Sequence, residues 1–188
     1  AWALDQIYSR IKSGRFWSEN TDDYFDIVAW HPYVFTTREV CDRDLFLDVE
    51  EPDTLWRDFN DACYRVMRKY GDGEKQAILT EVGFTDCGNP EWEERYARYT
   101  KKIVEYTCNM PYVRTVHHFR LLNENAMLSR PGIEDNQIGG LTEVYFGLFT
   151  DPEDGCQPRA RALALQEMTG STEDLAALGH RLTNRKER

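Results

Sequence analysis

Three short apolar runs in this sequence each end in a side chain that can do chemistry. The runs cover residues 25–30, 76–80 and 112–116. They are followed by His31, by Glu81 and by the pair His117 and His118. Imidazole and carboxylate groups serve enzymes as general acids, general bases and nucleophiles. If each run is a buried parallel strand, these groups lie together at the carboxyl edge of one sheet.

The segments between the runs predict the helices that position such a sheet. The predicted helices cover residues 2–12, 53–70, 90–106 and 158–168. The third is the clearest, because Asn89 is a good N-cap, Pro90 suits the first helical position, and aromatic side chains recur every three or four residues. Residues 144–149 are predicted to be extended. Strands that alternate with helices in this order predict an α/β fold with a parallel sheet.

The same segments resemble consecutive parts of one enzyme family. Residues 26–33 resemble the sixth strand of the clan A retaining glycosidases, the cellulase- and β-xylosidase-like (β/α)₈ barrels. Residues 78–83 resemble the seventh strand, residues 113–119 the eighth, and residues 145–149 the closing segment. The resemblance implies a partial (β/α)₈ TIM barrel over residues 1–170, containing strands six to eight with their helices. Residues 171–188 are then expected to form a short terminal helix and a polar tail.

The resemblance also implies an activity and a set of site residues. It implies hydrolysis of O-glycosidic bonds in a β-linked glycan with retention of configuration, and it places the nucleophile at Glu81. The residues expected to bind the carbohydrate substrate are Trp30, His31, Tyr33, His117, His118 and Phe119. Apart from this resemblance, a rigidly held carboxylate at a strand end suits attack on an anomeric carbon.

The second carboxyl group of such a mechanism is not evident in this chain. In the family it follows the fourth strand, so we expect the acid/base glutamate upstream of Ala1, in a missing N-terminal half of the barrel. Glu124 follows an Asn, as the acid does in the family, but lies after the eighth-strand segment. We therefore interpret Glu124 as a loop residue, and expect Arg120 to pair with a loop acid.

Two other hypotheses remain open from the sequence. The chain could be an inactive carbohydrate-binding remnant or partner subunit that keeps the pocket and lacks the acid. It could also be a metal-dependent hydrolase that uses His31, His117 or His118. Adjacent residues on a strand point to opposite faces, so only one of the paired histidines can face a pocket. This weakens the metal hypothesis, and no metal or cofactor is expected.

Composition excludes further classes of function. The formal net charge of −10 over 188 residues disfavours nucleic acid, which binds basic surfaces. No apolar run approaches the roughly 18 residues that a membrane helix needs. The five cysteines form no C-x-x-C pair, and their odd number argues against a complete disulfide framework. The compartment stays undecided.

Overall fold

A computed structural model describes residues 1–33, 52–86, 88–124 and 144–184. The chain divides into two compact units. The first combines Ala1–Val34, Asp53–Val82 and Tyr106–His117, and the second combines Phe35–Pro52, Gly83–Glu105 and His118–Arg188. The principal elements, in order, are α1 (Trp2–Lys12), β1 (Ile27–Trp30), α3 (Pro52–Lys69), β2 (Gln76–Val82), α4 (Glu93–Cys108), β3 (Val113–His118), α6 (Ala160–Thr169) and α7 (Leu175–Thr183). This order confirms the predicted alternation of helices and strands.

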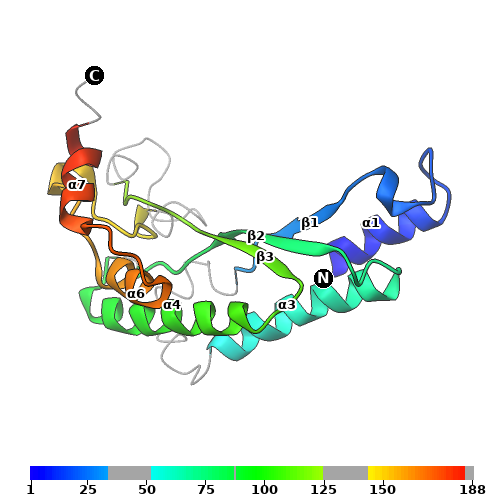
Figure 1. The fold of residues 1–188 in the computed structure, drawn as a ribbon, viewed down its shortest axis with the longest axis horizontal. Coiled ribbons are helices and arrows are strands. Elements are labelled where there is room, and N and C mark those ends of the chain that lie inside the picture. The colour runs from blue at the N-terminus through cyan, green and yellow to red at the C-terminus, as the bar shows by residue number, and fades with distance from the viewer. Residues whose placement is uncertain (34–51, 87, 125–143, 185–188) are drawn as a thin grey trace. The chain divides into compact units, whose positions relative to one another are not determined.

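The three strands form one sheet in the order β1-β2-β3 and run in the same direction (Figure 1). Strands β1 and β2 pair in parallel, with Val28 opposite Ala77 and Trp30 opposite Leu79. The prediction of adjacent parallel strands is therefore confirmed. The prediction of a partial (β/α)₈ barrel is wrong, because the described residues form an open three-stranded α/β sheet. Strand–helix alternation is shared by all classes of parallel α/β fold, so it could not predict whether the sheet closes into a barrel.

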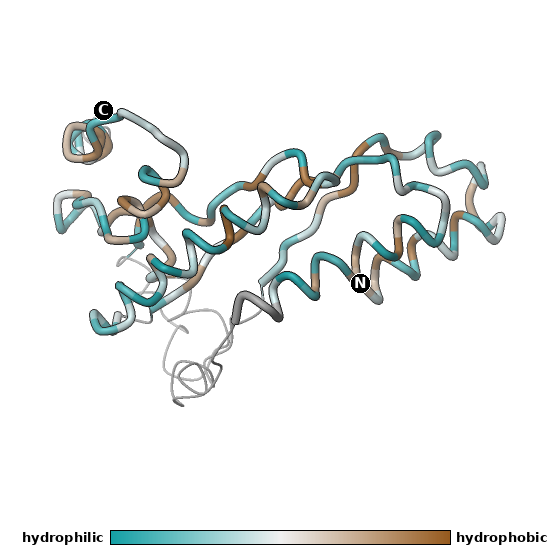
Figure 2. Tube along the Cα trace, turned by 60° about the horizontal axis from the view of Figure 1, so that its bottom comes forward, coloured by the Kyte–Doolittle hydropathy of each residue, from teal (hydrophilic) through white to brown (hydrophobic). Residues whose placement is uncertain are grey.

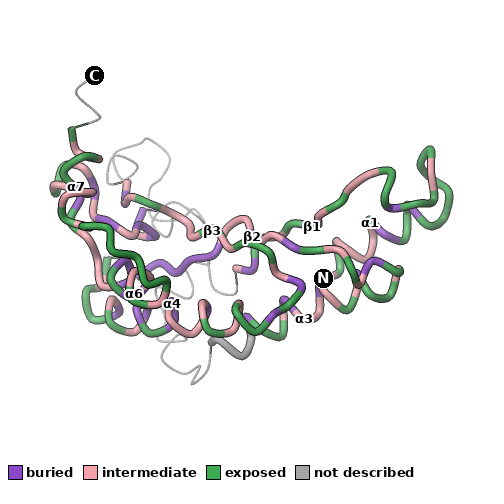
Figure 3. Tube along the Cα trace, in the orientation of Figure 1, coloured by how far each residue is buried: buried purple, intermediate pink, exposed green. Residues whose placement is uncertain are grey.

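The core of the first unit lies where α1 and α3 pack against β1. Tyr8 is fully buried, stacks on Tyr70 at 5.1 Å between ring centroids, and meets Phe25 edge-on at 5.6 Å. Val28 and Met67 complete this cluster. Apolar and polar residues alternate around the helices (Figure 2), as amphipathic helices on a core require. Buried and more exposed residues accordingly alternate along these helices (Figure 3).

A buried aspartate ties the segment before β1 to the turn before β2. The hydroxyls of Tyr8 and Thr21 donate to the two carboxylate oxygens of Asp72, at 2.9 and 2.8 Å. The ammonium group of Lys75 lies 3.2 Å from the same carboxylate. Burial and the Asp72 carboxylate both raise the pKa of Tyr8. Because every partner of this carboxylate can donate a hydrogen bond, its burial is compensated.

The second unit packs around the aromatic face of α4. Tyr96 is fully buried, and Phe84 stacks on it at 5.5 Å. The predicted extended segment at 144–149 is not a strand, because it makes only isolated bridges at Phe149. Asp174 caps α7 by accepting a hydrogen bond from the Ala177 backbone N–H. The expected boundary after residue 170 stays a prediction.

Candidate functional site

Glu81 lies near the carboxyl end of β2, where the sheet register brings the end of β1 beside it. The Tyr33 hydroxyl donates a hydrogen bond to Glu81 Oε2 at 3.0 Å. His31 Nδ1 lies 3.5 Å from the same oxygen. The side chains of His31 and Glu81 are 49% and 36% exposed, so a ligand in solvent can reach both. All three residues belong to the first unit.

Local sequence explains why these three side chains converge. Trp30 pairs with Leu79, so the residues just beyond Trp30 run alongside Glu81. Pro32 is buried and lies two residues beyond the end of β1. A proline has no backbone N–H to continue a sheet ladder, so the strand ends there and Tyr33 becomes available to the neighbouring strand end. The Thr80 hydroxyl further joins the strands by donating to the Trp30 carbonyl at 3.3 Å.

The imidazole, phenol and carboxylate of this cluster define what it can do chemically. A Tyr hydroxyl that donates to one carboxylate oxygen fixes the orientation of the carboxylate. The His31 imidazole lies 3.5 Å from the same oxygen, and a carboxylate held in this way can act as a base or a nucleophile. The arrangement therefore holds a partly exposed, oriented carboxylate at a sheet edge.

The other predicted substrate-binding residues have contacts or exposures of their own. The Trp30 indole donates to Asn60 Oδ1 at 2.7 Å and packs against the core cluster of the first unit. Packing of the Trp30 ring against this cluster is the structural role that large apolar residues at strand ends commonly have. His117 is exposed in the first unit. In the second unit, the Phe119 ring meets Phe146 at 5.5 Å.

His118 has an unusual environment at the end of β3. Its Nε2 atom is buried and has no hydrogen-bond partner within the described part of the chain, although the residue as a whole is half-buried. Burial, with a smaller contribution from Arg161, lowers the pKa of His118 to about 4. The imidazole is therefore neutral at pH 7. The paired histidines differ in exposure, as opposite faces of a strand require.

Two acidic loop residues, Glu124 and Asp151, have local partners. Arg120 pairs with Glu124, its neighbour four residues on, so the expected salt bridge is confirmed. Asp151 begins a short 3₁₀ turn, Pro152–Asp154, by accepting a hydrogen bond from the Glu153 N–H at 2.9 Å. Within the described ranges no group of three or more His, Cys, Asp or Glu side chains could hold a metal ion. None of the described helices is both long and apolar enough to cross a membrane.

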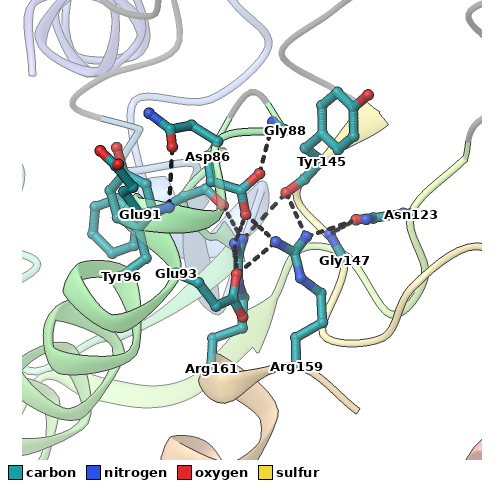
Figure 4. A network of polar contacts seen from close by, with 12 residues as sticks. Asp86, Gly88, Glu91, Glu93, Tyr96, Asn123, Tyr145, Gly147, Arg159 and Arg161 are labelled. Atoms are coloured by element: carbon teal, nitrogen blue, oxygen red, sulfur yellow. Dashed lines mark hydrogen bonds and ion pairs between the residues drawn. The ribbon is translucent and has the colours of Figure 1, made fainter. Parts of the chain in front are cut away.

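A buried charge network in the second unit was missed by sequence reasoning. Arg159 and Arg161 both pair with Asp86 and with Glu93 (Figure 4). Arg161 also donates to the Phe84 carbonyl at 2.6 Å. The side chains of Asp86 and Arg161 are 0% and 1% exposed. Two arginines at the start of α6 were the available signal, because cations at a helix N-terminus oppose the helix dipole and require nearby anions.

The two carboxylates of this network respond differently to burial. Burial raises the pKa of Asp86, against the opposing effect of the two arginines. Burial also disfavours ionisation of Glu93, but Arg161 and Arg159 outweigh it and the pKa of Glu93 is lowered. The cluster contains two cations and two potential anions, so it is neutral when both carboxyl groups are ionised. This balance suits a structural role in the second unit.

Comparisons with known proteins give a limited result. No protein-family model matches the chain, and no curated protein matches it. The crystal structure of a GH2 beta-galacturonidase from Eisenbergiella tayi bound to glycerol is similar, with a TM-score of 0.49 and 15% sequence identity over 79% of this chain. The match covers 24% of that protein, so this chain spans about a quarter of its length. At this identity and TM-score the similarity does not define the activity of this chain.

The comparisons also correct the assignment made from the sequence motifs. The assignment to the cellulase- and β-xylosidase-like barrels is wrong, because no family model matches the chain and its described strands form a three-stranded sheet rather than a barrel. The physical reason is the shortness of the motifs. A Glu after an apolar strand reports a rigid carboxylate at a sheet edge, and that arrangement does not specify one enzyme family.

Proposed function

We propose that this chain contributes the nucleophile of a glycoside hydrolase that cleaves O-glycosidic bonds of a β-linked glycan with retention. The observation that carries the proposal is the convergence of Tyr33 and His31 on one carboxylate oxygen of Glu81, at 3.0 and 3.5 Å. A nucleophilic carboxylate must be oriented, partly desolvated and reachable by a sugar ring. Glu81 combines these properties at the joined ends of two parallel strands.

The proposed reaction has two steps. In the first, a Glu81 oxygen attacks the anomeric carbon and forms a C–O bond while the glycosidic bond breaks and a second carboxylic acid protonates the leaving oxygen. In the second, water attacks the anomeric carbon, the same second group accepts a proton from it, and the Glu81 carboxylate is released. We place this acid/base outside residues 1–188, about 5–5.5 Å from Glu81 in the complete site.

Tyr33 and His31 have supporting roles in this mechanism. Tyr33 holds the Glu81 carboxylate through its hydroxyl. This hydrogen bond restricts rotation of the Glu81 side chain, so that the attacking oxygen is already oriented towards the substrate. His31 can add a hydrogen bond to a substrate hydroxyl, because almost half of its side chain is exposed. His117 is proposed to contact the same substrate from the exposed surface of β3. Trp30, His118 and Phe119 stay candidates for substrate contact.

Covalent trapping tests the assignment of the nucleophile. In the complete protein, an activated 2-deoxy-2-fluoro glycoside should attach to Glu81, and peptide mapping by mass spectrometry should locate the label there. Glu81→Gln keeps the side-chain shape, so it should abolish labelling and lower kcat by several orders of magnitude. Glu74→Gln, an exposed change in the turn before β2, should leave labelling unchanged.

Two results would overturn the proposal. A label on Glu124, or near-normal turnover by Glu81→Gln, would remove Glu81 from the nucleophile role. Glycan binding with no label and no turnover in the complete protein would instead support an inactive carbohydrate-binding protein. Metal found at stoichiometric amounts together with loss of turnover on chelation would support metal-dependent hydrolysis.

A further inference from the structure

An exposed aromatic cluster precedes β1 in the first unit. The side chains of Trp17 and Phe16 lie on the surface, and these residues are 76% and 49% exposed. Both rings contact the half-buried Tyr24, with centroid separations of 4.9 Å for Trp17 and 6.0 Å for Phe16. We call these three rings the Trp17 platform. Two large aromatic residues at this exposure are unusual, because burial of such rings stabilises a fold by about 1.5–3 kcal/mol each.

The loop that carries the platform is tightly organised. The Tyr24 hydroxyl accepts a hydrogen bond from the Ser18 N–H at 2.7 Å and donates one to the Ser18 carbonyl at 2.8 Å. Asn20 caps the short 3₁₀ turn Thr21–Asp23, and the buried Thr21 hydroxyl donates to Asp72. The rings are thus presented on a fixed backbone. A fixed surface binds a ligand with less loss of conformational entropy than a mobile one does.

The charge around the platform narrows the class of ligand. In residues 15–24 three exposed acids, Glu19, Asp22 and Asp23, outnumber the single base, Arg15, although Asp22 pairs with Lys75 at 2.8 Å. Negative charge disfavours nucleic acid and anionic lipid headgroups. Carboxylate groups accept hydrogen bonds readily, and the hydroxyl groups of a sugar can donate them without carrying a charge. Aromatic faces suit the apolar C–H faces of sugar rings. We propose that the Trp17 platform is a surface site for a neutral glycan chain.

The platform is separate from the candidate active site. It precedes the start of β1, whereas His31 and Tyr33 follow the end of β1 beside Glu81 (Figure 1). A ligand on Trp17 therefore does not occupy the Glu81 site. Its function would be to hold a polymer near the protein, which raises the effective concentration of glycan at any second site. This inference does not require Glu81 to be the nucleophile.

Affinity gel electrophoresis tests the platform. The protein is run in native gels that contain soluble mixed-linkage β-glucan, arabinoxylan or galactomannan, and in a gel that contains anionic polygalacturonate. At least one neutral glycan should retard the wild-type protein, and polygalacturonate should not. Trp17→Ala should weaken that interaction about tenfold, and Trp17→Tyr should restore part of it. Trp2→Ala is the matched control, because Trp2 is 77% exposed on α1 outside the platform.

Each outcome decides the proposal. Retardation that is lost in Trp17→Ala and kept in Trp2→Ala and Glu81→Gln supports a separate glycan site. Failure of every neutral glycan to retard the wild-type protein overturns it, as does an equal loss in Trp17→Ala and Trp2→Ala. Retardation abolished by Glu81→Gln but not by Trp17→Ala would also overturn it, because binding would then occur only at the Glu81 site. Circular dichroism of each variant distinguishes lost binding from lost folding.

Discussion

Replacement of Asp86 by Asn should destabilise the second unit strongly, because it leaves two arginines with one carboxylate. Asp86 is 0% exposed and pairs with both Arg159 and Arg161. Arg161 is itself 1% exposed, so water cannot compensate for the lost charge. Breaking one side of a buried ion pair typically costs about 3–5 kcal/mol. For a chain of this length that loss lowers Tm by about 6–20 °C.

The assay is urea unfolding followed by far-UV circular dichroism, with Tm measured in parallel. Glu167→Gln is the matched control in the same unit. Glu167 pairs with Lys101 at 2.5 Å, but the two side chains are 67% and 36% exposed, so its loss should cost less than about 1 kcal/mol. Raised salt should weaken the exposed pair and leave the buried network almost unchanged. An Asp86→Asn variant no less stable than Glu167→Gln would refute the reasoning.

Three further predictions concern the strand ends. Gly83→Ala should destabilise the fold by about 2 kcal/mol or more, measured by urea unfolding, because an added Cβ would lie 2.1 Å from the Phe119 carbonyl oxygen. If the proposed function holds, Tyr33→Phe should lower kcat about 10–100-fold, because it removes a hydrogen bond to the Glu81 carboxylate. The pKa of His118 is about 4, below the usual 6.5, so the unfolded state gains a proton first as pH falls. The contribution of His118 to the free energy of unfolding should therefore be fully present above pH 6.5. As the pH falls from 6.5 towards 4, the free energy of unfolding should decrease by about 3 kcal/mol.

Matched variants control these three experiments. Gly73→Ala should be mild, because the nearest atom to its added Cβ would belong to the flexible side chain of Arg68, at 3.1 Å. Tyr64→Phe removes a hydroxyl that bonds the Gly73 carbonyl, so kcat should be unaffected. His117→Asn should keep the wild-type pH dependence of stability, whereas His118→Asn should flatten it. Equal behaviour within any of these pairs would contradict the corresponding prediction.

Much of the secondary structure could be predicted because its signals are local. The stripe from Trp92 to Tyr106 and the cap at Asn89 predicted the helical region that contains α4. The run from Gln76 to Thr80 likewise predicted β2, which extends to Val82. Residues 144–149 misled the prediction, because an apolar run of six residues fits a strand and an irregular buried segment equally well. Tertiary contacts at Phe149 decided between them.

The candidate site, too, could be predicted only where its signals are local in the sequence. Glu81 and His31 could be named as candidates from the sequence because each comes directly after a short apolar run. The roles of Trp30 and His118 could not, because their partners are distant in the chain. Asn60 lies thirty residues from Trp30, and Arg161 lies far beyond His118. Side-chain burial and hydrogen bonding depend on those distant partners, so local pattern leaves them undetermined.

The sequence by itself determined the order of helices and strands, the parallel direction of the strands, and the placement of Glu81 at a strand end. These follow from periodicity and caps, which act within about one helical turn or one strand. Only the tertiary structure decided that the described strands form an open sheet, that Tyr33 bonds Glu81, and that Asp86 pairs with Arg161. Asp86 and Arg161 are separated by 75 residues, and the charge of one makes burial of the other possible. Such long-range compensation has no local pattern, because it depends on which distant groups the folded chain brings within hydrogen-bonding distance.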